Sequence, residues 1–202
     1  MTERAEIRLL QLKGTPREIG RGHGEQYRDL IRQFLELLRE NLEMRTRIKA
    51  GPKRIQDLVR KYWAYSTEYD LELEEEVEGI AEGSGLNIMD IMFLNAFLDL
   101  VNTRDGRIAA TLLGCTSFGV SPEVTTDRWC YIGQNYEMEA FYKRFMILLE
   151  VNPLHKPSCL VYTYAGVVGC AGLNSAGIGL CINFLHPKDA GYGIVYPFIM
   201  RK

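Results

Sequence analysis

The chain has 202 residues, enough for one domain with a substantial core or at most two small ones. Hydrophobic residues make up 47% and charged residues 25%, which is ordinary for a soluble globular protein. The formal net charge of −2 leaves no basic footprint, so the composition argues against nucleic acid and against an anionic membrane surface as partners.

The first six residues include acidic side chains and no apolar run follows them, so they do not read as a secretory signal. The apolar window 88–101 carries Asp90, Asn95 and Asp99 and is too short to span a bilayer. The five cysteines form an odd set without Cys-x-x-Cys spacing, which fits neither a metal site nor a disulfide framework. We therefore expect reduced thiols, no metal or cofactor, and a cytoplasmic protein.

The N-terminal part of the chain has helical patterning after one predicted strand, residues 7–13. Thr15, Pro16 and Glu18 form a capping box that begins a long amphipathic helix reaching about residue 38. The glycines early in this helix lower its propensity and predict close packing or a loosened first turn; they are Gly20, Gly22 and Gly24.

Three more helices are predicted at 55–63, 73–81 and 88–101 from their apolar spacing. The acidic run at 74–78 is typical of a solvated helix face. The last helix begins with Asn87 in a near capping box and is apolar on most sides, so we expect it to be buried.

After the turn signal at Asp105-Gly106 the apolar period changes from helical to two. The glycines and prolines between the predicted strands favour hairpins and a largely antiparallel sheet, and residues 197–200 resemble the first turn of a helix. The predicted strands are 115–120, 128–135, 145–151, 158–164, 167–173 and 178–184. Helices followed by a strand meander predict an α+β layered domain.

Cys115 lies at this junction and follows a glycine, which makes it a candidate nucleophile. A thiol needs a base or a lowered pKa to react as thiolate. A Cys-His pair with one of the three histidines, at 23, 155 and 186, stays open, although His23 on an apolar stripe resembles a core histidine. The alternative base is the α-amine that Cys115 would carry after cleavage of the Gly114–Cys115 bond, because such amines titrate at about 7.7 to 8.0.

Four segments carry a resemblance to a known family. They are Gly14–Gly24, Gly114–Phe118, Ile132–Glu137 and Gly172–His186, in this order along the chain. Together they resemble the acyl-coenzyme A:6-aminopenicillanate (isopenicillin N) acyltransferase-like family of cysteine N-terminal-nucleophile (Ntn) hydrolases. The resemblance implies an αββα sandwich formed as a single domain over 1–202, with a helical segment 1–114 and a strand-rich segment 115–202 that begins at the nucleophile.

The same resemblance implies a self-processing amidohydrolase or acyltransferase that acts on a C–N amide bond. Cleavage between Gly114 and Cys115 would make Cys115 the nucleophile of a thioester acyl-enzyme and, through its amine, the general base. Glu137 and Asn135 occupy the places of the family's acid and asparagine, and Asn183 that of an asparagine near the oxyanion. The partner implied is a small-molecule amide or acyl thioester.

Two departures from the family pattern leave alternatives open. Glu137 replaces an aspartate, and one methylene matters where geometry must hold to about half an ångström. The family also continues past residue 202 with a His-Thr-Asn-His-like segment, so the chain reads as truncated at its C-terminus. The alternatives are a non-catalytic subunit completed by a partner chain or missing segment, a homo-oligomer, and a papain-like Cys-His enzyme. Each candidate residue also has a structural interpretation: Asn135 and Asn183 as turn residues, Glu137 as a surface acid, and the other cysteines as core side chains.

Overall fold

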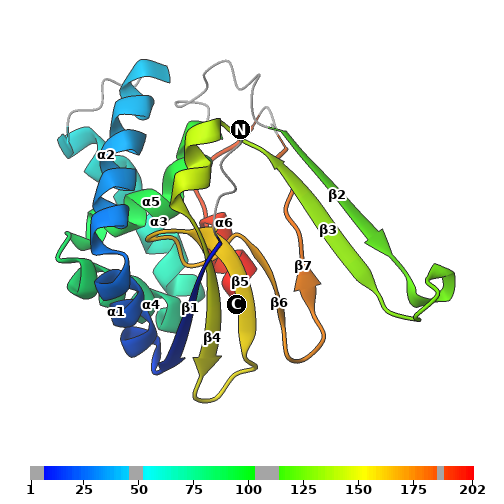
Figure 1. The fold of residues 1–202 in the computed structure, drawn as a ribbon. Coiled ribbons are helices and arrows are strands. Elements are labelled where there is room, and N and C mark those ends of the chain that lie inside the picture. Colours follow the sequence, from blue (N-terminus) through cyan, green and yellow to red (C-terminus); the bar gives the residue numbers. More distant parts are fainter. Residues whose placement is uncertain (1–6, 46–51, 103–113, 186–188) are drawn as a thin grey trace, which may run out of the picture.

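The computed structural model describes residues 7–45, 52–102, 114–185 and 189–202. Helices cover one side of a five-stranded sheet, and a two-stranded hairpin projects from the other end of the molecule (Figure 1). In chain order the elements are β1 (Arg8–Gly14), α1 (Pro16–Gln26), α2 (Arg28–Arg45), α3 (Pro52–Tyr69), α4 (Leu71–Ser84), α5 (Ile88–Asn102), β2 (Gly114–Val120), η1 (Pro122–Val124), β3 (Tyr131–Glu137), η2 (Ala140–Phe145), β4 (Met146–Pro153), β5 (Cys159–Tyr164), β6 (Ala171–Asn174), β7 (Gly179–Leu180) and α6 (Tyr196–Arg201).

The first predicted helix begins where expected, at a complete capping box. The main-chain N–H of Thr15 donates to Glu18 (2.8 Å), and the Glu18 N–H donates to the Thr15 hydroxyl (3.3 Å). The helix is not continuous, however, because Tyr27 leaves helical geometry at φ −115° and ψ 22° and separates α1 from α2. The break buries the Tyr27 ring edge-to-face beside His23, at 6.0 Å between ring centroids.

Close packing explains the glycines of α1. A Cβ at Gly20 would collide with the main-chain carbonyl of Glu76, and one at Gly24 would collide with that of Ile80. On the other helix, a Cβ at Gly79 or Gly83 would collide with carbonyls of α1. Helices α1 and α4 therefore cross with their backbones in contact, which only glycine permits.

Helix ends in this layer follow their local signals. Asp70 caps α4 by accepting from two main-chain N–H groups, Gly85 ends it in the left-handed conformation (φ 69°), and Asn87 accepts from the N–H of Met89 (2.9 Å) before α5. Helix α5 is buried along most of its length, as predicted. The acidic run is not uniformly solvated: Glu76 is 3% exposed and pairs with Arg201 of α6 (3.3 Å), because α6 packs over that turn of α4.

The larger sheet has the strand order β1-β4-β5-β6-β7 and is antiparallel except for the parallel pair β1–β4. Alternate residues of β4 are buried, namely Ile147, Leu149 and Val151, and they join the core formed with the helices. Helices packed on this largely antiparallel sheet give the α+β fold class that was predicted from the sequence.

Three predicted strands differ clearly from their expected bounds. Residues 165–170 form a turn rather than the start of a strand, since Gly166 has φ +85° and the Thr163 hydroxyl donates to the carbonyl of Val167 (2.9 Å). The ladder of β7 ends at Leu180, and residues 181–185 run on without strand pairing. The strand predicted from residue 128 begins at Tyr131 because Arg128 adopts φ 61° in the turn region. The turn predicted at 105–106 lies outside the described residues.

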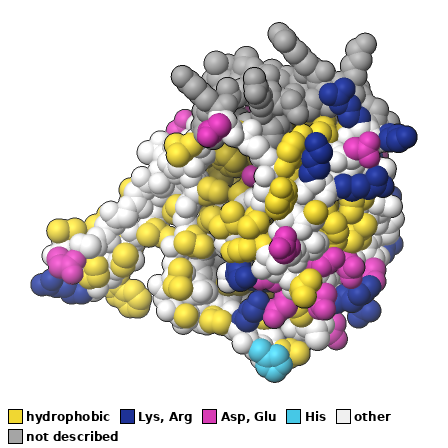
Figure 2. Space-filling model, turned by 180° about the vertical axis from the view of Figure 1, so that it is seen from behind, with side chains coloured by type: hydrophobic (Ala, Val, Ile, Leu, Met, Phe, Trp, Pro, Cys, Tyr) yellow, Lys and Arg dark blue, Asp and Glu magenta, His cyan; other side chains and the backbone are white. Residues whose placement is uncertain are grey.

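Strands β2 and β3 form a separate two-stranded sheet that projects beyond the helical layer (Figure 1). Hydrophobic side chains gather beside this hairpin and along it (Figure 2). Large exposed hydrophobic residues on the hairpin are Phe118, Val124, Trp129, Tyr131 and Ile132. Within the described residues no single helix is long and apolar enough to cross a membrane, and only α4 and α5 taken together, bent by 120°, reach that length and composition.

Candidate functional site

The hairpin register places the predicted nucleophile. Cys115 pairs with Tyr136, Gly114 with Glu137, and Thr116 with Asn135. Because directly opposed residues project to the same face and neighbours to opposite faces, the side chains of Cys115 and Tyr136 share one face. Glu137, Thr116 and Asn135 share the other, so the thiol and the carboxylate lie on opposite faces of the hairpin, on adjacent rungs of the ladder.

The Glu137 carboxylate lies over the residue that precedes the nucleophile. Its Oε1 accepts a hydrogen bond from the Thr116 hydroxyl (3.2 Å). Its Oε2 lies so close to Gly114 that a Cβ there would collide with it. The carboxylate therefore lies beside Gly114, and a side chain at position 114 would have to displace the end of the Glu137 side chain.

Asn183 reaches the same place from the segment after β7. Its Nδ2 donates to the main-chain carbonyl oxygen of Cys115 (3.1 Å). Asn135 is exposed, as Glu137 and Asn183 are, but within the described part of the chain its side chain has no hydrogen bond. Of the four predicted site residues, Glu137 and Asn183 therefore lie beside the main chain of residues 114–115, with the thiol on the face opposite the Glu137 carboxylate, and the Asn135 amide makes no contact there.

Gln134 is a contributor that the motif analysis missed. It lies on the Cys115 face of β3, two residues before Tyr136. Its Oε1 accepts from the main-chain N–H of Ile182 (2.9 Å) and its Nε2 donates to the Ile182 carbonyl. The two-residue strand period was the available signal, because it puts Gln134 on the same face as the thiol.

Tyr136 completes the thiol face. Its ring lies 5.3 Å from that of Tyr162, and its hydroxyl is buried without a hydrogen-bond partner among the described residues. Burial raises the pKa of this phenol, and the nearby thiols of Cys170, Cys115 and Cys181 act in the same direction. The Tyr136 hydroxyl is therefore neutral and retains its proton at working pH.

The remaining cysteines match their predicted place as core side chains of apolar strands only in part: Cys159 begins β5 and Cys170 belongs to the core. Cys130 is exposed at a turn before β3, which contradicts its interpretation as a core side chain. Cys159 and Cys181 are half-buried, and Cys170 is buried before β6. The Cys170 thiol lies 3.1 Å from the Tyr196 hydroxyl, and burial raises its pKa to about 11, so it is an inert thiol.

The described histidines do not hydrogen-bond to Cys115. His23 is fully buried, accepts the main-chain N–H of Gly166 at Nε2 (3.0 Å), and has a pKa lowered to about 3 by burial. It is the core histidine that the apolar stripe predicted. His155 is exposed between β4 and β5, and His186 lies outside the described residues.

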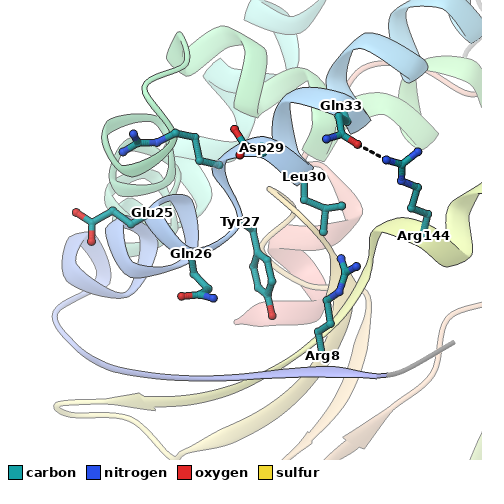
Figure 3. Close-up of a pocket in the computed structure, with 9 residues that line it drawn as sticks. Arg8, Glu25, Gln26, Tyr27, Asp29, Leu30, Gln33 and Arg144 are labelled. Carbon is teal, nitrogen blue, oxygen red and sulfur yellow. Dashed lines mark hydrogen bonds between the residues drawn. The ribbon is translucent and has the colours of Figure 1, made fainter.

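A separate surface hollow of about 480 Å³ lies where β1, η2 and the α1–α2 junction meet (Figure 3). Its wall carries charges of both signs, among them Arg8, Asp29 and Arg144, and Arg144 donates to Gln33 across it (2.5 Å). None of the predicted site residues lines this hollow, so it is not the site of the thiol chemistry.

No known family model matches the chain. The chain is 28% identical over 178 residues to the 40 kDa form of acyl-coenzyme A:6-aminopenicillanic-acid-acyltransferase from Emericella nidulans. It is a distant relative of that acyltransferase. The match covers 86% of this chain and 46% of the relative, so the chain spans about half the length of the relative it matches.

Proposed function

We propose that this chain is the self-processing, nucleophile-bearing part of a cysteine Ntn amidohydrolase or acyltransferase acting on a C–N amide bond. The observation that carries the proposal is that two polar side chains lie on either side of the predicted cleavage point. Glu137 lies over Gly114, Asn183 binds the Cys115 carbonyl, and Gly114 and Cys115 are the first two residues of strand β2. The distant relationship to an acyltransferase supports the class of reaction.

In the processing step the Cys115 sulfur attacks the carbonyl carbon of Gly114. The C–N bond breaks as the acyl group moves from nitrogen to sulfur, and the released nitrogen takes up the thiol proton. Water then hydrolyses the thioester, which leaves a carboxylate on Gly114 and a free thiol and amine on Cys115. Glycine favours this step because it tolerates the backbone distortion that the attack requires.

In the turnover step the free α-amine accepts the proton of its own thiol. The thiolate attacks the substrate carbonyl, the leaving amine or thiol departs with a proton, and a thioester to Cys115 remains. Water or an acceptor amine then attacks this thioester and restores the thiol. The substrate class is accordingly a small-molecule amide or an acyl thioester, and hydrolysis and transfer share the same acyl-enzyme.

The other residues have supporting roles in this proposal. The Glu137 carboxylate, fixed by Thr116, binds the ammonium form of the Cys115 amine once Gly114 has been cut away. Asn183 fixes the main chain of the nucleophile and supplies an amide donor to the developing oxyanion. Asn135 stays in the proposed set as a polar side chain on the Glu137 face.

Mass spectrometry of the expressed 202-residue chain tests the proposal. We expect fragments corresponding to 1–114 and 115–202, and a single intact chain for Cys115→Ala. Cys130→Ser is the matched control, because Cys130 is an exposed thiol and its loss should leave cleavage intact. A wild-type chain that neither cleaves nor forms an acyl-enzyme at Cys115 with a reactive thioester would refute the proposal.

The exposed hairpin supports a second proposal of another class. Trp129 and Val124 are 70% and 76% exposed in the connection between strands β2 and β3, and the described helices do not cover this hairpin. Two-stranded sheets with bare apolar surface rarely stand alone. The chain would then be a non-catalytic subunit whose hairpin binds a partner polypeptide. Size-exclusion chromatography with light scattering tests this, and a monomer at all concentrations would contradict it.

A further inference from the structure

Gln134 forms the link between the hairpin and the segment that carries Asn183. After Leu180 the chain leaves the sheet, and the main-chain groups of Ile182 lose their strand partners. The Gln134 amide replaces them, accepting from the Ile182 N–H (2.9 Å) and donating to the Ile182 carbonyl. One side chain thus supplies both halves of a missing sheet bridge across a separation of 48 residues.

The next residue after this bridge is Asn183, which donates to Cys115. Since Ile182 is fixed to β3 by two hydrogen bonds, the Asn183 backbone is fixed relative to the Cys115–Tyr136 pair on the same hairpin. We propose that Gln134 is a positioning residue that holds Asn183 at the main chain of Cys115. This inference rests on the proposed nucleophilic role of Cys115 and adds a residue to its machinery.

The chemistry of the side chain makes the role testable. An amide presents one donor and one acceptor, which Ile182 requires, whereas a carboxylate presents acceptors only. In Gln134→Glu the ionised carboxylate would face the Ile182 carbonyl oxygen and repel it. The protonated carboxyl group again has one donor and one acceptor, so it would restore both hydrogen bonds. Glutamate ionises at about pH 4.3 in water, and a facing carbonyl oxygen raises that value.

Acylation of Cys115 by p-nitrophenyl acetate, located by peptide mass spectrometry, is measured from pH 5 to 8 in the full chain. For Gln134→Leu we expect acylation to be at least about tenfold slower than wild type at every pH, since a donor displaced by about 1 Å loses most of its effect. For Gln134→Glu the deficit should match this at pH 8 and shrink toward pH 5. Alkylation of Cys115 by iodoacetamide forms no oxyanion and should change less than about threefold.

Three controls separate this role from general damage. Gln33→Glu introduces the same carboxyl group on α2, away from the hairpin, and should behave as wild type. In an Asn183→Ala background, Gln134→Leu should slow acylation no further, because the amide side chain that Gln134 positions is already absent. Hydrogen exchange in residues 181–185 should be faster in Gln134→Leu, whether or not the chain has activity.

The outcomes distinguish the two proposals. If wild-type Cys115 is not acylated while exchange in 181–185 rises in Gln134→Leu, the contact is structural and the proposed function fails. If wild-type Cys115 is acylated, and the Gln134 variants match it at every pH, the positioning role is wrong and the proposed function stands. A Gln134→Glu deficit that does not vary with pH also overturns the positioning role.

Discussion

His23 gives the most quantitative prediction, because its burial ties the stability of the fold to pH. The imidazole is 0% exposed, its Nε2 accepts the Gly166 N–H at 3.0 Å, and burial lowers its pKa from 6.5 to about 3. Between these values the unfolded chain binds a proton that the folded chain does not. The free energy of unfolding therefore falls by about 1.4 kcal/mol for each pH unit below 6.5.

At pH 5 the loss attributable to His23 amounts to about 2 kcal/mol, a large part of the 5–15 kcal/mol that is typical of a folded domain. Urea melts at pH 7.0, 6.0 and 5.0 measure it. His23→Gln retains an acceptor for the Gly166 N–H and does not titrate, so we expect its stability to decline less over this range. His155→Gln, at an exposed turn, should leave the decline unchanged. An equal decline in wild type and His23→Gln would refute the reasoning.

Three further predictions concern side-chain pairing and packing in the fold. Arg201→Met leaves the buried Glu76 carboxylate unpaired and should cost about 3–5 kcal/mol at pH 7. Burial raises the pKa of this carboxyl group, so the cost should shrink as the pH is lowered from 7 to 5, and an equal loss in melts at both pH values would contradict this. Tyr136→Phe removes a hydroxyl that has no partner among the described residues, so it should be neutral or stabilising. Tyr196→Phe loses the hydroxyl that pairs with the Cys170 thiol and should cost about 0.5–1.5 kcal/mol. The reverse order of stability in thermal melts would contradict these hydrogen-bond assignments. Gly79→Ala should cost about 1–3 kcal/mol, because the added methyl group pushes α1 away from α4. Gly119→Ala is the control, since a Cβ there meets open space and should cost nothing by overpacking. Equal melting temperatures for the two variants would show that α1 and α4 can move apart without loss of stability.

Elements with local signals could be predicted from the sequence. The capping box at Thr15 and the Asn87 cap each involve residues three or fewer positions apart, and both are present in the structure. The start of β6 could not be predicted in this way. The turn before it is held by Asn95 of α5, which bonds the Gly166 carbonyl and the Val168 N–H at 3.0 Å each. These contacts join residues more than 70 positions apart, and no local pattern encodes them.

The candidate site shows the same difference between features with a local sequence signal and contacts between distant residues. The Gly114–Cys115 junction was predicted from a short motif and Glu137 from the family resemblance, and strand alternation then determines which face each side chain occupies. Gln134 was missed because its partner, Ile182, is 48 residues away in a segment predicted to be a regular strand. Glu76 was misinterpreted for a related reason, since its partner Arg201 is 125 residues away.

Glutamate stands at position 137 where the acyltransferase-like family that the sequence resembles has an aspartate, and the extra length of its side chain has a structural counterpart. Glu137 lies directly opposite Gly114, and its longer arm lets one oxygen bind the Thr116 hydroxyl while the other lies over Gly114. A side chain at position 114 would have to displace this carboxylate, so glycine suits the contact. Cleavage of the Gly114–Cys115 bond would give Cys115 an α-amine next to the same carboxylate. The carboxylate that contacts Gly114 before processing would then form the ion pair that orients the nucleophile after it.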